Sequence, residues 1–393
     1  MLSYGRQTVE EDDIRAVISA LRSDNLTQGK RVRLFEELIC EYTGAKYCVV
    51  CSSGTAALYL AYRASGLKEE DSIITTPVTF LSTVTAAIHL GGVPAFCDIE
   101  PVTYNMDTGL LEDAIERCHN PHAIVPVHFG GLPCDMERIR EVADGKSLFV
   151  IEDACHALGS KWKDTSGRWH RVGDCAFSDM TVFSFHPVKT ITTCEGGAIT
   201  TNDKTLYTKL LHLREHGITR HEKSFIGAPD GPWYYELVEP SFNFRISDVH
   251  CALGINQLRK VERFIDRRQK IAALYRELLS GYHFIKTPCE KEEVVNAYHL
   301  YPVRIAFENI GVSKKAWFKE MEAKGIRLQV HYIPIHLQPY IQWRYGFRRG
   351  DFPESERFYR EEVSLPIYPL LTDNDVKRVT EELITTLTTH MAA

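Results

Sequence analysis

The lysine best placed for chemistry is Lys189, in the stretch VFSFHPVKTITTCEGGAIT at residues 182–200. The stretch begins as a buried strand and ends in a turn that contains Gly196 and Gly197. Burial at the end of an apolar strand lowers the pKa of a lysine amine. An unprotonated amine can attack a carbonyl carbon and form a Schiff base. The alternative is a solvated lysine without a chemical role, and the stretch alone leaves both open.

An acid follows a second apolar strand, in FVIEDACHALGS at residues 149–160. A carboxylate in the position of Asp153 is costly unless it is paired or lies at the end of the strand. It could hold a proton on a ring nitrogen of a ligand, and His156 could donate to a ligand oxygen. The alternatives are a helix cap or ion pair for Asp153 and simple packing for His156.

Three further features could bind an anion such as phosphate. CSSGTAAL, at residues 51–58, is a turn of small residues that opens a helix, where backbone N–H groups and the helix dipole favour anions. It lacks the Gly-Lys-Ser of a nucleotide phosphate loop and the dinucleotide glycine pattern. Asn243, in SFNFRISD, could reach a phosphate from a turn, and Ser184 could bind an oxyanion. An ordinary turn and a helix cap are the alternatives.

Together these stretches indicate one ligand, which carries a phosphate, a ring nitrogen and an aldehyde. Pyridoxal phosphate has these three groups, and its enzymes use a lysine Schiff base with an acidic partner for the pyridine nitrogen. The sequence therefore predicts a site for pyridoxal phosphate and predicts no metal.

The elements that must position these residues follow from the apolar pattern. Strand-length apolar runs alternate with helical patterns over the first two-thirds of the chain, which predicts a parallel or mixed sheet covered on both faces. A long helix is predicted over residues 247–279. Strands are then expected at 299–307 and 326–335 around a helix at 313–325, and a last helix after Thr372.

Composition excludes several classes of function. The net charge of −6 argues against nucleic acid or an anionic membrane as partner. No run approaches the length of a membrane span, and the first residues lack the apolar core of a secretory signal. Cys48, Cys51, Cys97 and Cys155 lie in apolar runs, as free cysteines do. A reduced, cytoplasmic environment is therefore expected.

The order SSGTAAL, IEDACHALG, FSFHPVKTITTCEGGAITTND and FNFRISD resembles the sugar aminotransferases of the DegT/DnrJ/EryC1/StrS family over nearly the whole chain. One difference is Cys194, where the family usually has glycine or alanine before EGG. The resemblance implies the α/β fold of the aspartate-aminotransferase type (fold type I), pyridoxal phosphate as cofactor, and a homodimer with shared active sites. The change of pattern along the chain predicts a large cofactor-binding domain at 1–250 with an N-terminal arm at 1–30, and a linking helix with a small α+β domain at 251–393.

The resemblance also implies roles for individual residues. Lys189 is then the Schiff-base lysine, Asp153 the partner of the pyridine nitrogen, and His156 a neighbour of the ring's phenolic oxygen. Phe80 stacks on the ring, unless it is only a core aromatic. The phosphate is bound by Thr55, Ala56 and Ser184, and by Asn243 of the neighbouring subunit. The nucleotide sugar is contacted by Tyr4, Leu26, Thr27, Gln28, Gly29, Gln329, Val330, His331 and Tyr332.

Within the family, LTQGK, QVHY and Tyr4 resemble the subgroup of the pseudaminic acid pathway. This implies transfer from L-glutamate, which leaves as 2-oxoglutarate, to C4 of a UDP-4-keto-6-deoxy-N-acetylhexosamine. The expected substrate is UDP-2-acetamido-2,6-dideoxy-β-L-arabino-hexos-4-ulose, and the product is UDP-4-amino-4,6-dideoxy-N-acetyl-β-L-altrosamine. The alternative within the family is another nucleotide-linked 3- or 4-keto sugar.

Three other functions are possible alternatives for the sequence. A related dehydratase has histidine in place of the lysine, and Lys189 argues against it. A metal or redox site could use CVVC, at residues 48–51, with His331 and His336, but the sequence has no second cysteine pair at zinc spacing. A regulatory protein that binds the cofactor without turnover would need a DNA-binding segment or basic patch, and the sequence shows neither.

Overall fold

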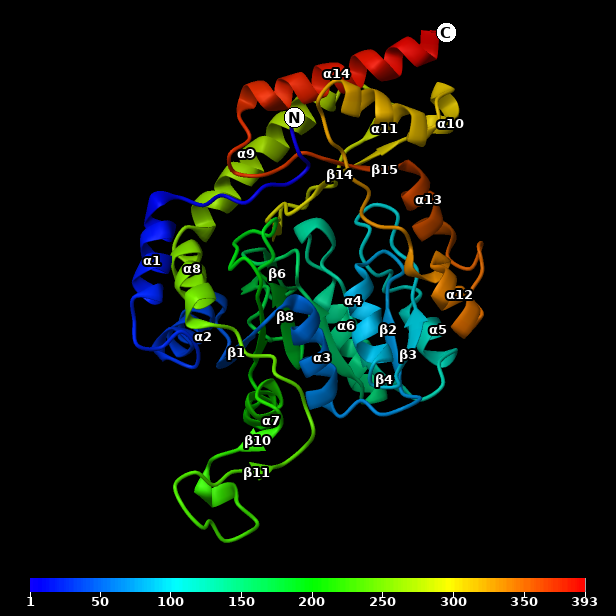
Figure 1. The fold of residues 1–393 in the computed structure, drawn as a ribbon. Coiled ribbons are helices and arrows are strands. Elements are labelled where there is room, and N and C mark those ends of the chain that lie inside the picture. Colours follow the sequence, from blue (N-terminus) through cyan, green and yellow to red (C-terminus); the bar gives the residue numbers. More distant parts are fainter. Residues whose placement is uncertain (393) are drawn as a thin grey trace.

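The computed structural model describes residues 1–392, so residue 393 of the predicted C-terminal domain lies outside the described part. A mixed sheet with strand order β1-β9-β8-β5-β4-β2-β3 forms its centre (Figure 1). Strand β9 is antiparallel to β1 and β8, whereas the pairs from β8 to β3 are parallel. This confirms the predicted mixed α/β sheet. Its strands are β1 (Tyr47–Cys51), β2 (Ser72–Thr75), β3 (Val93–Phe96), β4 (Pro121–Ile124), β5 (Phe149–Asp153), β8 (Met180–Ser184) and β9 (Gly197–Thr201).

Helices precede the sheet and connect its strands. The side chains of Ser53, Asp135 and Asp203 each accept an N–H of the helix that follows, which explains where α3, α6 and α7 begin. The helices are α1 (Glu11–Leu21), α2 (Lys30–Thr43), α3 (Gly54–Ser65), α4 (Leu81–Ile88), α5 (Leu111–Glu116), α6 (Met136–Lys146) and α7 (Lys204–Arg214). A small sheet beside them contains β6 (Lys161–Lys163), β7 (Trp169–Arg171) and β13 (Val294–Val295).

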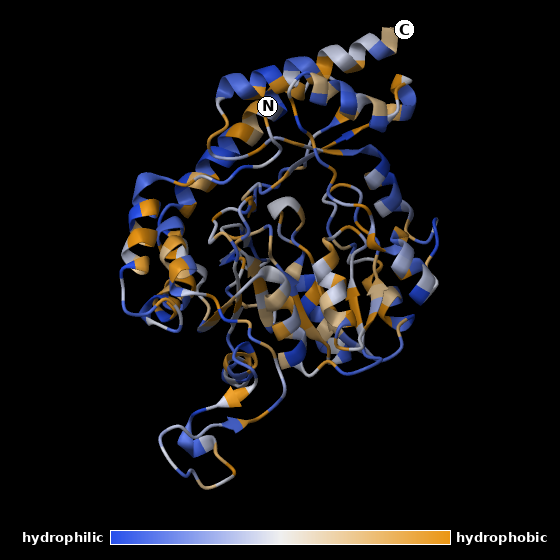
Figure 2. Cartoon of the chain, viewed as in Figure 1, coloured by the Kyte–Doolittle hydropathy of each residue, from blue (hydrophilic) through white to orange (hydrophobic). Residues whose placement is uncertain are grey.

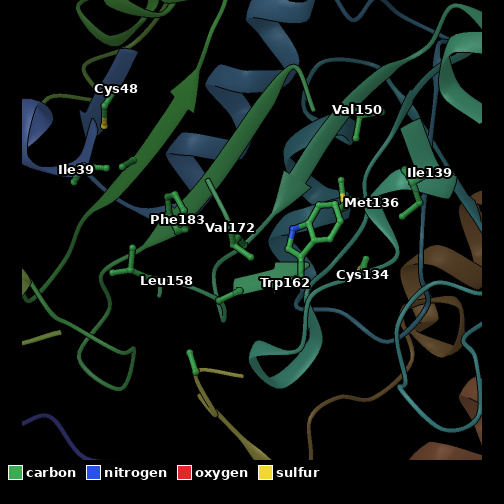
Figure 3. Close-up of a cluster of buried hydrophobic side chains, with 14 of the residues drawn as sticks. Ile39, Cys48, Cys134, Met136, Ile139, Val150, Leu158, Trp162, Val172 and Phe183 are labelled. Atoms are coloured by element: carbon green, nitrogen blue, oxygen red, sulfur yellow. The ribbon is translucent and has the colours of Figure 1, made fainter. Parts of the chain in front are cut away.

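Alternate residues of the central strands enter two different hydrophobic cores, which explains their continuous apolar runs. In β1, Val49 and Cys51 pack with residues of α3 and α7. Cys48 and Val50 face the other core, part of which Figure 3 shows around Trp162. Figure 2 shows the same concentration of hydrophobic residues on the central strands. Since Cys48 and Cys51 enter different cores, CVVC cannot bind one metal ion with both cysteines.

The single helix predicted over residues 247–279 is wrong. Ser247 begins a helix, as its side chain accepts an N–H of the first turn, but the chain leaves helical geometry at Lys260, with φ −103° and ψ −2°. The Lys260 amine lies 2.8 Å from Asp13 and 2.9 Å from Asp12 of α1. This contact is distant in sequence, so no local glycine or proline marks the break. The two helices are α8 (Asp248–Leu258) and α9 (Val261–Leu279).

The C-terminal part has its own core around a small antiparallel sheet, in which β14 lies between β12 and β15. Helix α9 serves both cores, since Phe264 packs in the first and Ile271 and Tyr275 pack in the second. The domain boundary near residue 250 stays a prediction. The elements are β12 (Ile285–Lys286), β14 (Tyr301–Ile305), β15 (Glu362–Leu365), α10 (Phe307–Ile310), α11 (Lys314–Ala323), α12 (Pro339–Tyr345), α13 (Pro353–Glu361) and α14 (Asp373–Ala392). Helices α11 and α14 confirm the predictions for 313–325 and after Thr372.

Residues 326–335 do not form the predicted strand. They make isolated bridges at Ile326 and Gln329, bend at His331, and end at Ile335, the first residue of a short 3₁₀ helix. The backbone of Gln329 pairs with Ser364 of β15, and two residues further on the carboxylate of Glu362 accepts the backbone N–H of His331 at 3.0 Å. The segment is thereby held beside the site described below.

An arm at residues 215–243 projects from the body of the molecule (Figure 1). It contains the two-stranded pair β10 (Ile218–Thr219) and β11 (Glu236–Leu237). Its apolar side chains are strongly exposed, with Ile226 at 100% and Trp233 at 70%. Among residues 1–392, no helix combines the length and the apolar character needed to cross a bilayer.

Candidate active site

Segments that are distant in sequence meet at one edge of the central sheet. The ends of β5 and β8, the start of α3 and residues 329–332 border a cavity of about 390 Å³. The carboxyl ends of parallel strands are where α/β sheets usually bind ligands. The predicted site residues that line the cavity are Tyr4, Thr55, Phe80, Asp153, His156, Ser184, Lys189, Gln329, Val330, His331 and Tyr332.

Lys189 lies in the turn that follows β8, where its backbone N–H donates to the carbonyl of His186 at 2.9 Å. Its Nζ is 3.5 Å from Nε2 of His299. Burial lowers the pKa of the Lys189 amine, against the opposing effect of the nearby Cys155 and Asp153. A lowered pKa raises the fraction of unprotonated amine, which is the form that attacks a carbonyl carbon.

Asp153 is the last residue of β5 and is buried. Its Oδ2 accepts the hydroxyl proton of Thr83 at 2.7 Å, and its Oδ1 accepts the N–H of Cys155 at 3.2 Å. The Thr83 hydroxyl oxygen lies 2.8 Å from that of Thr79, so a short chain of hydroxyls orients the carboxylate. Each carboxylate oxygen can accept a further hydrogen bond, and a protonated ring nitrogen would supply it.

The start of α3 can bind an anion. Ser53 accepts the N–H of Ala56 with its side chain at 3.1 Å and the N–H of Ala57 with its carbonyl at 3.0 Å. The N–H groups of Gly54 and Thr55 open the helix and have no intrahelical acceptor, so they are available to a phosphate. Ala56, which was also expected to bind the phosphate, donates its N–H to the Ser53 side chain.

Two glycines allow the anion-binding turn to lie close to its neighbours. A Cβ on Gly54 would lie 2.8 Å from the Cβ of Ser184. A Cβ on Gly197 would lie 2.4 Å from the carbonyl oxygen of Ser53. Both positions therefore require glycine, and they bring the end of β8 and the start of β9 against the start of α3.

The hydrogen bonds of His156 define its protonation. Its Nδ1 accepts the N–H of Gly130 at 3.3 Å, so the ring proton is on Nε2, which lies 2.9 Å from the hydroxyl oxygen of Tyr332. Burial lowers the pKa of His156 well below its ordinary value, and the charge of Lys189 adds to this effect. The neutral ring therefore donates to Tyr332 and orients that hydroxyl at the cavity wall.

Phe80 and Tyr4 border the entrance to the cavity. Phe80 is 54% exposed, which contradicts the alternative that it is only a core aromatic. Its ring centroid lies 5.9 Å from that of Tyr332. The ring of Tyr4 lies 5.2 Å from that of His331. Both rings are positioned to contact a ligand that enters from solvent, and their predicted roles stay predictions.

Two groups of predicted residues lie elsewhere in the chain. Residues 26–29 follow α1, where the N–H of Gly29 donates to Asp248 at 2.7 Å and Gln28 borders a separate hollow with Arg245. Asn243 lies at the base of the arm, where its backbone pairs with that of Glu215. Neither group lines the cavity of its own chain.

Some residues at the cavity were not predicted. Thr83 orients Asp153, His299 lies beside Lys189, and Glu362 with Ser364 holds His331. A threonine inside a helix and a lone histidine before a strand carry no spacing signal. They become visible only when the fold brings distant segments together.

Cys194, at the position where glycine or alanine was expected, has a left-handed backbone. Its φ is +68°, and its N–H donates to the Thr192 hydroxyl at 2.9 Å. A non-glycine residue in this region costs about 1–2 kcal/mol. The turn of the lysine stretch is therefore preserved at the cost of moderate strain.

The cavity fits pyridoxal phosphate by the chemistry of its donors. The buried carboxylate of Asp153, the buried amine of Lys189 and the open N–H groups of α3 match a ring nitrogen, an aldehyde and a phosphate. The Cβ distances of Gly54 and Gly197 show that the cradle leaves no room for side chains at these positions. The predicted roles of the individual residues stay predictions.

Known proteins share this architecture. The UDP-4-amino-4,6-dideoxy-N-acetyl-beta-L-altrosamine transaminase of Campylobacter jejuni is 37% identical over 388 residues, which are 98% of each chain. The structure of Helicobacter pylori PseC, an aminotransferase involved in the biosynthesis of pseudoaminic acid, matches with a TM-score of 0.89 at 31% identity over 99% of each chain. Spr1654 from Streptococcus pneumoniae, solved in its PLP-form, matches with a TM-score of 0.88 at 27% identity over 99% of each chain.

The model of one family, described as the DegT/DnrJ/EryC1/StrS aminotransferase family, matches residues 7–384. This range includes the strand ends and the turn around the cavity. The chain belongs to the DegT/DnrJ/EryC1/StrS aminotransferase family and has its fold type I architecture.

Proposed function

We propose that this protein transfers an amino group to the keto carbon of a nucleotide-linked sugar, with pyridoxal phosphate as its cofactor. The observation that carries the proposal is the single cavity that brings together Lys189, Asp153 and the start of α3. Family membership makes the protein an aminotransferase. The three groups supply an amine, a carboxylate and backbone donors, which match the aldehyde, the ring nitrogen and the phosphate of the cofactor.

When bound, pyridoxal phosphate supplies a carbon that forms Schiff bases and a ring that accepts the electrons of a Cα–H bond. Asp153 keeps the proton on the pyridine nitrogen, and Thr83 holds the carboxylate in place. The remaining residues that would hold the cofactor are Thr55, Ala56, Phe80, His156 and Ser184. Of these, Thr55 and Ser184 border the same end of the cavity as the open N–H groups of α3.

Lys189 then moves protons. Its amine, once free, removes the proton from Cα of the amino donor as a general base. In the second half of the reaction it delivers a proton to the sugar's C4. The face of the sugar to which Lys189 delivers this proton would set the configuration of the new amine.

The proposed donor is L-glutamate, which leaves as 2-oxoglutarate. The proposed acceptor is UDP-2-acetamido-2,6-dideoxy-β-L-arabino-hexos-4-ulose, which gives UDP-4-amino-4,6-dideoxy-N-acetyl-β-L-altrosamine. The similarity to the Campylobacter transaminase and to PseC supports this choice. A hollow of about 1020 Å³ adjoins the cavity at Gln329 and Val330 and supports a nucleotide-linked acceptor. Its lining includes Lys315, Lys319 and Arg360, which can attract phosphates, beside Glu308 and Glu361.

The protein is further proposed to act as a homodimer with shared active sites. Asn243 and residues 26–29 lie outside the cavity of their own chain, so they would contribute to a ligand site only from a second chain. The arm supports this arrangement, because Ile226 and Trp233 are exposed apolar side chains that a partner would cover.

An absorbance spectrum of the purified protein tests the proposal. Bound cofactor is expected to give a visible band that fades when L-glutamate is added and returns when the UDP-4-keto sugar is added. A band that ignores glutamate would contradict the donor. A band restored by a different nucleotide-linked keto sugar, but not by this one, would contradict the acceptor. Absence of any band after pyridoxal phosphate is supplied would overturn the function.

A further inference from the structure

His299 is a buried imidazole in the cavity to which the mechanism above assigns no role. It lies just before β14 and is 4% exposed. Its Nε2 lies 3.5 Å from Nζ of Lys189, which is the reacting amine. The ring of His156 packs against it with centroids 4.5 Å apart. A buried imidazole at this distance from the amine can control the amine's direction and its protonation.

The two ring nitrogens of His299 have different surroundings. Nδ1 is buried and has no hydrogen-bond partner among residues 1–392. A buried N–H without an acceptor is rarer in folded proteins than an unused acceptor, so the proton belongs on Nε2. Burial lowers the pKa of His299 well below its ordinary value, and the charge of Lys189 adds to this effect. The ring is therefore neutral and presents its one N–H to Lys189.

We propose that His299 is a positioning residue for Lys189: its Nε2–H donates to the lone pair of the unprotonated amine and holds the amine in the cavity. The inference rests on the proposed function in so far as Lys189 is the reacting group. A hydrogen bond to the neutral amine favours that form over the ammonium ion. His299 thus adds to the effect of burial and keeps the amine ready to attack a carbonyl carbon.

Other groups face this pair from neighbouring elements. Asp153 and Cys155, at the end of β5, raise the pKa of the amine and so oppose His299. Arg268 of α9 donates to the carbonyl of His299 at 3.4 Å, and His331 approaches from residues 329–332. Arg268, and His331 when protonated, disfavour a positive imidazole. The surroundings therefore keep the His299 ring neutral while they pull the amine toward its charged form.

Two amide substitutions separate a hydrogen bond at Nε2 from the mere presence of a polar side chain. In His299→Gln the amide reaches the position of Nε2, whereas in His299→Asn it reaches only that of Nδ1. The full-length protein, stripped of cofactor, is labelled with acetic anhydride at graded pH. The labelled peptide that contains Lys189 is quantified by mass spectrometry, with exposed Lys68 as internal reference. Thermal unfolding of each variant checks that the fold is retained.

We expect Lys189 of the wild type to label at lower pH than Lys68. His299→Asn moves the labelling midpoint of Lys189 to higher pH by roughly one unit, and His299→Gln stays close to the wild type. In the holoenzyme, the glutamate half-reaction slows about 10-fold in His299→Asn and less in His299→Gln. Equal midpoints in the wild type and His299→Asn overturn the inference, and so do equal shifts in both variants.

Failure of the proposed function gives a different result. The wild type then shows no cofactor band, while the labelling difference between His299→Asn and His299→Gln persists. If only the inference about His299 is wrong, the cofactor band still responds to glutamate, but Lys189 labels alike in the two variants.

Discussion

The two sides of the cavity are built in different ways. On the cofactor side, the functional groups come from the ends of regular elements, with Asp153 at the end of β5, Ser184 at the end of β8 and Gly54 at the start of α3. On the opposite side, residues 329–332 form no strand: the backbone of Gln329 pairs with that of Ser364, and the side chains of Glu362 and Ser364 hold His331. Backbone ladders fix an element end many times over, whereas residues 329–332 have one backbone bridge and otherwise depend on side-chain contacts at His331. The cofactor side is therefore expected to be rigid, and the opposite side to determine the acceptor.

The largest effect is expected on the cofactor side, from Lys189→Arg. Arginine keeps the positive charge but cannot lose its proton at neutral pH, so it can neither form the Schiff base nor move protons. Turnover should fall by about 10³-fold or more, and the visible band should be lost. Lys68→Arg, at an exposed position, is the matched control and should retain full turnover. Turnover that survives Lys189→Arg would refute the assignment.

Asp153→Asn should have the next largest effect. The amide can still accept the Thr83 hydroxyl proton, but it has no charge to keep a proton on the pyridine nitrogen. Both half-reactions should slow by about 10²-fold, while cofactor remains bound, as stopped-flow absorbance would measure. Thr83→Val keeps the charge and only frees the carboxylate, so its effect should be smaller. If Thr83→Val is the more harmful change, orientation rather than charge is what Asp153 provides.

Glu362→Gln tests whether the two sides of the cavity can be separated. Glu362 accepts hydrogen bonds from the His331 N–H and, at 2.6 Å, from the Ser364 hydroxyl, and an amide cannot accept both with a carboxylate's strength. The KM for the sugar should rise about 10-fold, while the glutamate half-reaction stays unchanged. Glu381→Gln, on the exposed face of α14, is the control. An equal loss in the glutamate half-reaction would show that both sides act as one unit.

The smallest effect is on stability and concerns pH. Burial lowers the pKa of His331 to about 3, from an ordinary value of 6.5. Below pH 6.5 the unfolded chain therefore binds a proton that the folded protein does not bind. As the pH falls below 6.5, the free energy of unfolding should decrease by up to about 1.4 kcal/mol per pH unit because of this residue. Above pH 6.5 the contribution of the unprotonated ring to stability is fully present. Urea unfolding of His331→Gln should show a shallower decline, and His221→Gln should match the wild type.

The same contrast explains what could be predicted from the sequence. Apolar runs and small-residue turns predicted the strands of the mixed sheet and the start of α3, because these features depend on residues that are adjacent in sequence. The structure places Lys189, Asp153 and that turn around one cavity, as the sequence predicted. The break at Lys260 and the course of residues 326–335 were predicted wrongly, since both involve contacts with residues distant in sequence, in α1 and in β15.

Residues that act through distant contacts escaped prediction for the same reason. His299 precedes a strand in a different part of the chain from Lys189, and Thr83 lies within a helix. Neither has a spacing that marks it, and each matters only through one side chain that folding brings near. Sequence reasoning therefore described the cofactor side of the cavity better than the residues that orient it.

Gly197 has a consequence for inheritance. Its Cα faces the carbonyl of Ser53 so closely that a single added carbon would lie 2.4 Å from that oxygen. Every other amino acid carries that carbon, so each missense change at this codon pushes the anion-binding turn away from the strand behind it. The codon has no mild substitution, and a lineage that keeps the enzyme must keep this glycine.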